Sequence, residues 1–400
     1  MGVPIYAPVD WRFAVLARVA GKWVKITMLS GLAQDIELLW QLNRSTMMVF
    51  SVPSEDPRVC ILHTDGHPYI DIGDRWVLGW RKSPPTLDPY PGNWQLKYAG
   101  RIWQIQDTAD GTEGRTMVTC FDALKHMEKR ICRDVNGAFN KQVKFWATPG
   151  TEIAKTLIDR TQFYVGSCHI DTDSGTWTDS ALITSAYDQA YVLPSIVTMA
   201  DTGTMDLNPT YSDGSDTAGT FMVLGGLPRL GADKPGVKLG YAAPPRRATG
   251  FDRTLSLDNL ANSIGLFGKS SKGKFVTAVD SASQAEYDVF EDISVIPDVE
   301  NTELLQMLAD EELFLRKAPN DLVTIVPTPE DSPRFFNEYF LGDTIQVRSS
   351  MPQTSPTGPF PVTREAITGL SRVYGARLTI DNDFGESVTE MIVSQQAEGA

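Results

Sequence analysis

The sequence predicts an α+β protein that is predominantly β, with two tube-like β-barrels flanking mixed α/β domains. Short runs rich in Val, Ile, Thr, Trp and Tyr, separated by Pro, Gly and Asp, dominate both ends of the chain. Apolar residues at helical spacing occur mainly between those ends. A Gly-Asp turn followed by an apolar-rich strand occurs twice, as IGDRWVLGWR at residues 72–81 and as LGDTIQVRSS at residues 341–350.

Length and composition limit the class of protein. A chain of 400 residues with 42% hydrophobic residues exceeds what one core usually organises, so we expect roughly two to four domains. The formal net charge of -14 argues against a protein that binds nucleic acid by neutralising phosphates. Four cysteines without a Cys-x-x-Cys pair favour synthesis in a reducing cytoplasm. We see no secretory signal and expect no membrane segment.

Changes in composition along the chain suggest four domains. Residues 1–148 are expected to form an N-terminal β-barrel, and residues 149–250 an α/β domain with long loops. Residues 251–322 are expected to form a β-hairpin plus a helix, and residues 323–400 a C-terminal β-barrel.

The first domain is predicted from alternating and apolar short runs. The expected strands are TMMVFSVP (46–53), RVCILHT (58–64), HPYIDIG (67–73), DRWVLGWR (74–81), KYAGRIWQIQDT (97–108) and RTMVTCF (115–121). Asp65-Gly66 suits the positive φ values of a two-residue hairpin turn. A short helix is expected at 123–130.

The second domain opens with a helix predicted from TPGTEIAKTLIDRT (148–161), which has a threonine cap, a proline at its start and apolar residues at helical spacing. Between residues 167 and 250 we expect strands with long loops. The apolar runs there are YVLPSIVTM (191–199) and TFMVLGGL (220–227). PGVKLGYAAPPRRATG (235–250) is expected to be a linker, because adjacent prolines oppose regular structure.

The rest of the chain is predicted as two strands, a helix and then strands. NSIGLFGKSSKGKFVTAVD (262–280) predicts two strands around a basic turn, and ENTELLQMLADEELFLRKAP (300–319) a helix. The closing strands are expected in LVTIVPT (322–328), DTIQVRSS (343–350), REAITGLSRVYGARLTID (364–381) and SVTEMIVSQ (387–395).

The two Gly-Asp segments have similar surroundings. Each is followed by a proline-rich loop, then a strand with an arginine, then a turn and another strand. Gly73 and Arg101 are 28 positions apart, and Gly342 and Arg372 are 30 apart. This correspondence predicts that the chain contains the same small barrel twice. Chance similarity of short β segments is the alternative.

Cys60, His63 and His67 form the most metal-like spacing, C-x-x-H-x-x-x-H. On a strand the first two side chains point to opposite faces, and Asp65-Gly66 turns the segment into a hairpin. A tetrahedral zinc site also requires a fourth ligand that the sequence does not provide. We therefore expect an ordinary hairpin.

Gly268-Lys269-Ser270 resembles the end of a phosphate-binding loop. The full motif requires a glycine at position 263, where Ser263 stands, and a following helix, where a strand is predicted. A hairpin turn is the better interpretation.

Asp171, Asp173, Gly175 and Asp179 offer alternating carboxylates in a glycine-containing loop, which are ligands suited to calcium. The spacing departs from the twelve-residue loop of helix-loop-helix sites. A solvated turn is the favoured interpretation.

No catalytic pattern is present: we find neither a Gly-x-Ser-x-Gly elbow nor a His-Glu-x-x-His motif. We predict no catalytic, cofactor-binding or metal residues, no cofactor, and a protein that is not an enzyme. Trp76, Trp80, Trp94 and Trp103 lie around the first Gly-Asp strand. Most are expected in a core, and one or two at a subunit interface.

Three stretches, taken in order, are similar to one protein family. They are KYAGRIWQIQDT with RTMVTCFDALKHMEKR, then GKFVTAVDSASQAEYDVFEDISVIPDVENTELLQMLADEELFLRKAP, then LGDTIQVRSS with SRVYGARLTIDNDFGESVTEMIV. In this order the chain resembles the baseplate hub, or minor tail, proteins of long-tailed, siphovirus-type bacteriophages, especially those infecting actinobacteria. Outside residues 167–250 the resemblance covers most of the chain.

The resemblance implies a structural virion protein of the tail tip, synthesised in the host bacterial cytoplasm. Family hubs are homotrimers in which two tail-tube-like barrels per chain form a pseudo-sixfold ring at the distal end of a noncontractile tail. Such a ring adapts the sixfold tail to a threefold tip and lines or closes the DNA ejection channel, so phage DNA is met only in transit. Residues 73–105 and 342–380 would form the ring contacts. The implied partners are the distal tail protein ring, the tape measure protein, and other minor tail or receptor-binding tip proteins active in host attachment.

Two other functions remain open from the sequence. One is a carbohydrate-active or glycan-binding β-rich protein that acts on the host cell wall and uses the tryptophans as stacking platforms. The other is a capsid decoration protein, which would be present in many copies per particle.

Overall fold

The structure is a computed structural model that describes residues 9–29, 33–82, 93–110, 113–187, 189–268, 274–295, 302–329, 332–350, 365–381 and 385–394. Its helices are α1 (Pro57–Cys60), α2 (Leu124–Met127), α3 (Gly150–Val165), α4 (Val192–Asp201), α5 (Ser281–Tyr287) and α6 (Thr302–Arg316). Its strands are β1 (Asp10–Val19), β2 (Lys22–Met28), β3 (Gln34–Gln41), β4 (Met47–Pro53), β5 (Arg75–Lys82), β6 (Trp94–Asp110), β7 (Glu113–Phe121), β8 (Val143–Pro149), β9 (Ile170–Asp171), β10 (Leu182–Tyr187), β11 (Asp206–Tyr211), β12 (Met222–Leu227), β13 (Asp233–Tyr241), β14 (Ala248–Ser256), β15 (Ser263–Phe267), β16 (Phe275–Val279), β17 (Glu291–Val295), β18 (Asn320–Pro327), β19 (Thr344–Ser350), β20 (Glu365–Asp381) and β21 (Gly385–Ser394).

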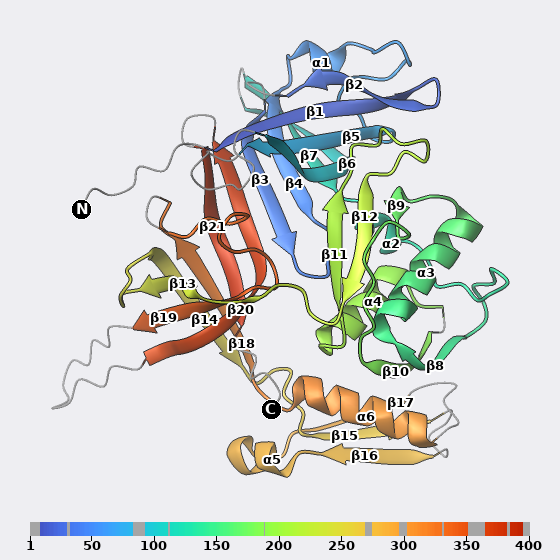
Figure 1. Ribbon diagram of the computed structural model, residues 1–400, viewed down its shortest axis with the longest axis vertical. Helices are drawn as coiled ribbons and strands as arrows, with labels where there is room; N and C mark the ends of the chain where they lie inside the picture. Colours follow the sequence, from blue (N-terminus) through green and yellow to red (C-terminus); the bar gives the residue numbers. More distant parts are fainter. Residues whose placement is uncertain are drawn as a thin grey trace.

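One large sheet joins the two ends of the chain (Figure 1). It has 13 strands, and its main path runs β14-β18-β21-β20-β3-β4-β7-β6-β5-β1-β2, with β19 beside β20 and β13 beside β19. The protein is therefore predominantly β, as predicted. Because the pairing produces a single continuous sheet, it does not confirm the prediction of two separate closed barrels.

The second half of this sheet repeats the strand order of the first. The order β3-β4-β7-β6-β5-β1 in the first half corresponds to β14-β18-β21-β20-β19-β13 in the second. Every neighbouring pair in the two series is antiparallel except β13 and β19, which are parallel where β1 and β5 are antiparallel. The predicted duplication of the Gly-Asp segments is thus present in the pairing of six strands.

The long strands β6 and β20 show the duplication residue by residue. Each has 17 residues, and its eighth residue is an arginine, Arg101 or Arg372. Each pairs with β5 or β19 up to the arginine, and with β7 or β21 from the arginine onward. A β-bulge skips the second residue after the arginine in both ladders, at Trp103 and at Tyr374. Conserved pairing and an identical bulge position indicate one structural unit used twice.

The two halves are joined where β20 pairs with β3, from Gly375 opposite Gln41 to Ile380 opposite Ile36. A second contact lies across the sheet, because the buried Arg81 guanidinium pairs with the Glu386 carboxylate and Trp11 Nε1 donates to Glu386 Oε2 at 2.9 Å. Removing one partner of a buried ion pair strongly destabilises the folded protein, because the other charge is then buried without compensation. These contacts hold the two halves together as one body.

The segment between the two halves forms a separate α/β layer (Figure 1). The sheets β11-β12-β9 and β10-β8 lie against α3 and α4, whose buried residues share a core with the outer face of β1 and β5. Alternate residues of β5 therefore enter two cores, Val77 on one side and Trp76 and Leu78 on the other. A strand covered on both faces is expected to be apolar along its covered part, as residues 76–80 of β5 are.

A small unit is inserted between β14 and β18. Its sheet has the order β16-β15-β17, with α6 packed on one face through Leu305 and Ala309. In the described part of the chain, no helix is long and apolar enough to cross a bilayer.

Most predicted elements are present, and four predictions are wrong. The run 58–64 contains α1 instead of a strand, because Asp56 accepts a hydrogen bond from Arg58 N and Pro57 begins a helical turn. The run 67–73 is a loop, and the apolar run 191–199 contains α4, with Pro194 in the first turn where proline is tolerated. The expected linker 235–250 contains most of β13 and the start of β14, with the two prolines between them.

Candidate functional site

The strongest candidate for a functional feature is the pair of Gly-Asp turns at equivalent places in the two halves. In each, the arginine of the long strand donates from Nε to the carbonyl of the turn glycine: Arg101 to Gly73, and Arg372 to Gly342 at 3.2 Å. Both glycines have positive φ, +112° and +82°, a conformation that other residues adopt at a cost. Spacings of 28 and 30 positions thus produce the same local contact in the two halves.

The two turns differ in what covers them. The Asp74 carboxylate is exposed, and its ion pair with Arg101 is long, at 3.8 Å. Asp343 is buried and accepts from Ala232 N, Phe340 N and Lys234 Nζ at 2.7–2.8 Å. The segment around Ala232 and Lys234, which follows the middle layer, covers the second turn. Asp74 of the first turn is exposed to solvent.

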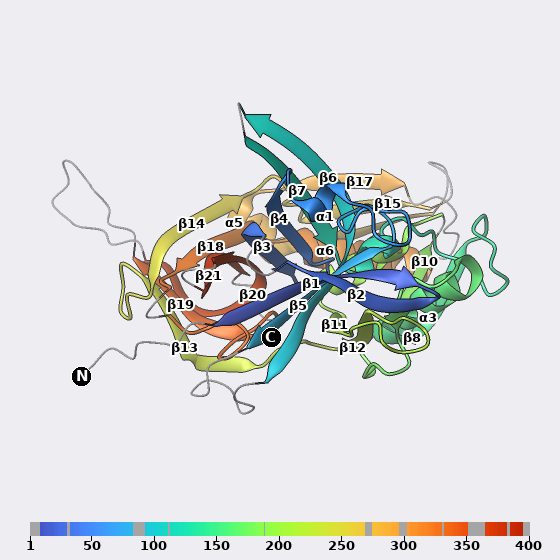
Figure 2. The ribbon, with the colours of Figure 1, turned by 90° about the horizontal axis from the view of Figure 1, so that it is seen from above.

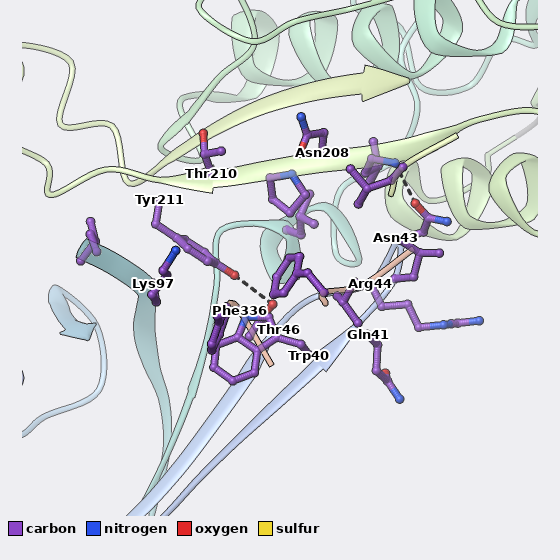
Figure 3. Close-up of a pocket in the computed structure, with 18 residues that line it drawn as sticks. Trp40, Gln41, Asn43, Arg44, Thr46, Lys97, Asn208, Thr210, Tyr211 and Phe336 are labelled. Atoms are coloured by element: carbon purple, nitrogen blue, oxygen red, sulfur yellow. Dashed lines mark hydrogen bonds between the residues drawn. The ribbon is translucent and has the colours of Figure 1, made fainter. Parts of the chain in front are cut away.

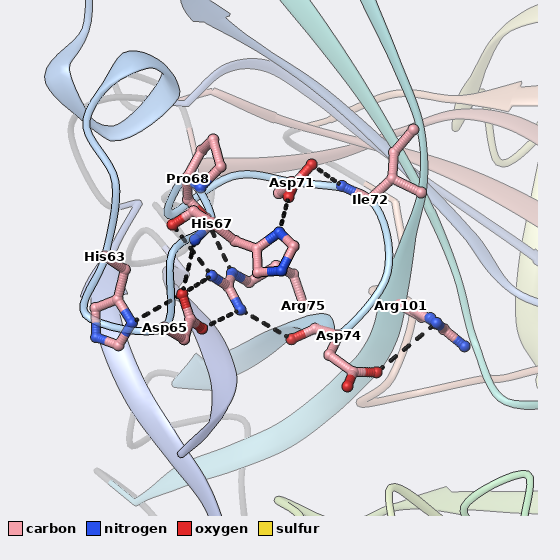
Figure 4. A network of polar contacts seen from close by, with 9 residues as sticks. All are labelled: His63, Asp65, His67, Pro68, Asp71, Ile72, Asp74, Arg75 and Arg101. Atoms are coloured by element: carbon pink, nitrogen blue, oxygen red, sulfur yellow. Dashed lines mark hydrogen bonds and ion pairs between the residues drawn. The ribbon is translucent and has the colours of Figure 1, made fainter.

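A buried arginine secures the loop before the first turn (Figure 4). Arg75 pairs with Asp65 at 2.8 Å and donates to the carbonyl of Pro68 at 3.0 Å. The Arg75 hydrogen bond to the Asp65 carboxylate lowers the pKa of that carboxyl far below its usual range. Asp65 is thus a structural anion that orders residues 61–74.

A pocket of about 380 Å³ lies between β3, β6, β11 and residues 336–341 (Figure 3). Its walls are mainly apolar, with Trp40 and Phe336 in an edge-to-face contact. The Tyr211 hydroxyl donates to Thr46 Oγ1 at 2.9 Å, and Asn43 donates to Asp206 at 2.9 Å. These lining groups thus pair with other side chains of the protein.

Asp206 connects the middle layer to both halves of the large sheet. It is buried and accepts from Asn43, from Leu230 N and from Arg372, the arginine of the second turn. A buried carboxylate with three donors is well satisfied. The second Gly-Asp turn is therefore fixed to the middle layer through this residue.

Asp122 is a second buried acid at this junction. It accepts from Ser45 Oγ, Thr46 N and Leu124 N at 2.8–3.1 Å, and from Tyr211 at 3.3 Å. Burial raises its pKa to about 6, although these donors oppose the shift. Its role in the structure is to hold the β3–β4 turn against β11.

The predicted metal-like residues do not converge. The Cys60 thiol donates to Ser54 O, His63 lies near Asp65, and His67 contacts Asp71 at 3.0 Å. The turn at Asp65-Gly66 is present, with His63 N donating to His67 O at 2.8 Å, but without flanking strands. Among the described residues, no group of three or more His, Cys, Asp or Glu side chains could hold a metal ion.

Of the phosphate-loop-like motif, Lys269 and Ser270 lie outside the described residues. Gly268 N donates to Lys274 O at 2.9 Å, and the next element is strand β16 instead of a helix. The hairpin interpretation is supported.

The calcium-like acids form a turn. Asp171 accepts from Asp173 N and Ser174 N at 2.9 and 3.1 Å, and Asp173 pairs with Lys155 at 3.0 Å. Asp179 is exposed. The carboxylates are thus used separately, as in a solvated turn.

The four tryptophans near the first turn are core or half-buried. Trp76 is buried and stacks on Phe221 with ring centroids 4.0 Å apart. Trp94 lies under the Arg12 guanidinium at 4.0 Å, and Trp80 and Trp103 are partly buried. Trp146 on β8, which was not among the four tryptophans singled out from the sequence, is exposed. None of these four side chains is fully exposed.

Comparison with family models and with curated proteins finds no match. Comparison with solved structures does find matches. The tail protein from Neisseria meningitidis MC58 aligns over 97% of each chain with a TM-score of 0.50 and 12% identity. The prophage MuSo2 43 kDa tail protein from Shewanella oneidensis aligns over 96% of this chain and 98% of that one, with a TM-score of 0.52 and 11% identity. The chain is similar in fold to phage tail proteins.

The similarity extends to a PdpA-VgrG complex. A chain of the Francisella PdpA-VgrG complex aligns over 97% of this chain and 58% of its own length, with a TM-score of 0.53 and 6% identity. At these identities the likeness concerns the fold alone. The resemblance found in the sequence therefore agrees with the fold, at the level of tail proteins in general.

Proposed function

We propose that the chain is a structural virion protein, the trimeric baseplate hub at the distal end of a noncontractile, siphovirus-type tail of an actinobacteriophage. In this role it adapts the sixfold tail to a threefold tip and lines or closes the DNA ejection channel. The protein acts by assembly and is not an enzyme. Its location is the tail tip of the virion, after synthesis in the host cytoplasm.

The duplicated unit is the observation on which this proposal depends. Each chain contains the same strand order, the same bulge and the same arginine-to-glycine contact twice. Three chains would present six equivalent units around an axis that is only threefold. The fold likeness to tail proteins supports the proposal.

Charge supports the passage of DNA without binding. Three chains together have a formal charge of -42, three times -14. A surface of this sign does not displace the counterions of DNA, so it provides no electrostatic retention.

The expected partners follow from a hub's position. A distal tail protein ring and the end of the tape measure protein would contact one side of the ring, and receptor-binding or other minor tail proteins the other.

In the same proposal, residues 1–148 and 323–400 form the ring units, and residues 149–250 and 251–322 form the peripheral domains. The structure adds that β13 and β14, which precede residue 323, pair with strands of the second half.

Two measurements test the proposal. Light scattering of the purified chain is expected to give three times its mass of 44.1 kDa. Electron microscopy of virions labelled with antibody to the chain is expected to show label at the tail tip only. Label on the capsid would contradict it, as would a monomer that cleaves peptidoglycan and loses that activity when one acidic residue is replaced.

A further inference from the structure

Half of β6 has a main-chain edge that no described strand uses. On one side β6 pairs with β5 only as far as Arg101, and on the other side it pairs with β7 from Arg101 to Asp110. Beyond Arg101, therefore, the side next to β5 has no ladder among the described residues. Figure 2 shows this part of the β6–β7 hairpin extending beyond the rest of the molecule.

The equivalent edge in the second half is occupied. β20 pairs with β19 up to Arg372 and with β21 from Arg372 onward, and β3 fills the remaining edge from Gly375 to Ile380. Burial follows this difference. Gly375, Ala376 and Leu378 are buried, whereas most of residues 104–109 are exposed.

The strand equivalent to β3 also has an unused edge. In the second half that strand is β14, which pairs with β18 and stands at the end of the sheet path. No ladder is present along its other side within the described residues. The described residues thus include one open edge of each kind that the β20–β3 joint brings together.

We propose that β6 of one chain pairs with β14 of a second copy, antiparallel and in the register of the joint between β20 and β3. Residues 104–109 would lie opposite residues 251–256. This inference rests on the proposed function and names the contact through which the hub assembles. Exposed strand edges are templates for pairing with another chain, and here the protein's own fold shows the pairing that fits.

The register can be transferred position by position. On the neighbouring strands, Phe121 lies opposite Arg101 and Ser394 lies opposite Arg372. The residues that precede these two partners, Cys120 and Val393, are therefore equivalent. Cys120 lies opposite Met48, and Val393 opposite Val323, on the next strand of each half. Further across, Leu38 lies opposite Met48 and Arg253 lies opposite Val323. Leu38 of β3 and Arg253 of β14 are therefore equivalent.

The joint between β20 and β3 places Leu38 opposite Leu378, six residues after Arg372. The residue six positions after Arg101 is Asp107, so the proposed register places Asp107 opposite Arg253. The Asp107 carboxylate accepts from Thr116 Oγ1 at 2.6 Å within its own hairpin. The existing joint contains a charge pair across its two strands, Arg377 with Glu37 at 3.2 Å.

The contact joins different surfaces on the two copies, so each added chain again presents the same open edges. A head-to-tail contact of this kind either closes into a ring or grows as a filament. With two units per chain, closure at three chains gives an alternating ring in which intrachain and interchain joints have the same pairing. A ring also leaves none of these edges open.

Disulfide trapping tests the register. In a Cys60→Ser background, which removes the exposed native thiol, Gln106→Cys and Thr254→Cys are combined in one chain. The proposed register places these residues directly opposite, within the roughly 4.4–6.8 Å between Cα atoms that a disulfide spans. Mild oxidation is expected to give a covalently closed trimer on non-reducing gels.

The matched control combines Met117→Cys with Thr254→Cys. Met117 lies opposite Gln106 but on β7, about 4.8 Å further from the free edge, which places it beyond disulfide reach. A trimer in solution without the Gln106–Thr254 crosslink, or with equal crosslinking in the control, would overturn the inference and leave the trimeric hub standing. A monomer at every concentration would overturn both.

Discussion

At the residue scale, the two turn glycines provide a built-in comparison. A Cβ on Gly73 would meet nothing within 4 Å, whereas a Cβ on Gly342 would lie 2.4 Å from the carbonyl oxygen of Leu230. Both positions have positive φ. A larger residue at either position therefore pays for the left-handed backbone conformation, whereas at position 342 it would also clash with Leu230.

We expect Gly73→Ala to lower the free energy of unfolding by about 1–2 kcal/mol, the cost of a left-handed conformation for an L-residue. Gly342→Ala should lower it by roughly 2–5 kcal/mol, since overpacking is added. Urea unfolding monitored by fluorescence measures both. Equal losses would show that the contact of the second turn with residues 229–234 does not contribute to stability.

Asp122 makes stability depend on pH. Its folded pKa of about 6 is above the usual aspartate value, so its contribution is fully present below about pH 4 and is lost as the pH rises through 6. Between pH 4 and pH 7 this amounts to roughly 3 kcal/mol, from two pKa units at 1.36 kcal/mol each.

The difference in unfolding free energy between the native chain and Asp122→Asn isolates this effect, because the other titrating groups are common to both. The native chain should gain stability relative to the variant as the pH falls from 7 to 4. A difference that stays constant over this range would mean that Asp122 remains charged in the folded protein.

At the scale of elements, periodicity and turn residues predicted most strands of the large sheet. The Gly-Asp turns and the arginines at positions 101 and 372 predicted the duplication, because two similar turns at similar spacings indicate similar local structures. The bulges at Trp103 and Tyr374 were not predicted, since a single extra residue in a strand leaves no distinct pattern in the sequence.

The wrong predictions have identifiable causes. Asp56-Pro57 is a helix-start signal that was available in the sequence and outweighs the β-branched run after it. Residues 67–73 look like a strand, but Arg75 and Asp65 fix them as a loop through a contact that only the folded chain makes. In α4, Val192, Ile196 and Met199 lie on one buried face, so a helical period was present beneath an apolar run that looks like a strand.

The candidate site was only partly predictable. The Gly-Asp turns were identified, but the pocket and the acids at positions 122 and 206 depend on strands that are distant in the sequence. The open edges of β6 and β14 could not be recognised before the pairing order was known. An unpaired edge is a property of the whole sheet and has no local pattern.

At the scale of the whole molecule, the duplication makes the two halves controls for each other. The amides of residues 375–380 lie in a strand paired on both sides within one chain. Those of residues 104–109 lie in a strand that, among the described residues, is paired on one side. Assembly through the β6 edge would remove this difference, because both segments would then be paired on both sides.

Hydrogen exchange with mass spectrometry measures the difference directly. In a dilute monomer, peptides covering residues 104–109 should exchange at least about tenfold faster than peptides covering residues 375–380, since amides on an open edge exchange without unfolding of the core. In the trimer, the first segment should slow to the rate of the second, and the second should not change. If residues 104–109 exchange equally fast in both states, some other surface joins the chains, and the open edge has no part in forming the ring.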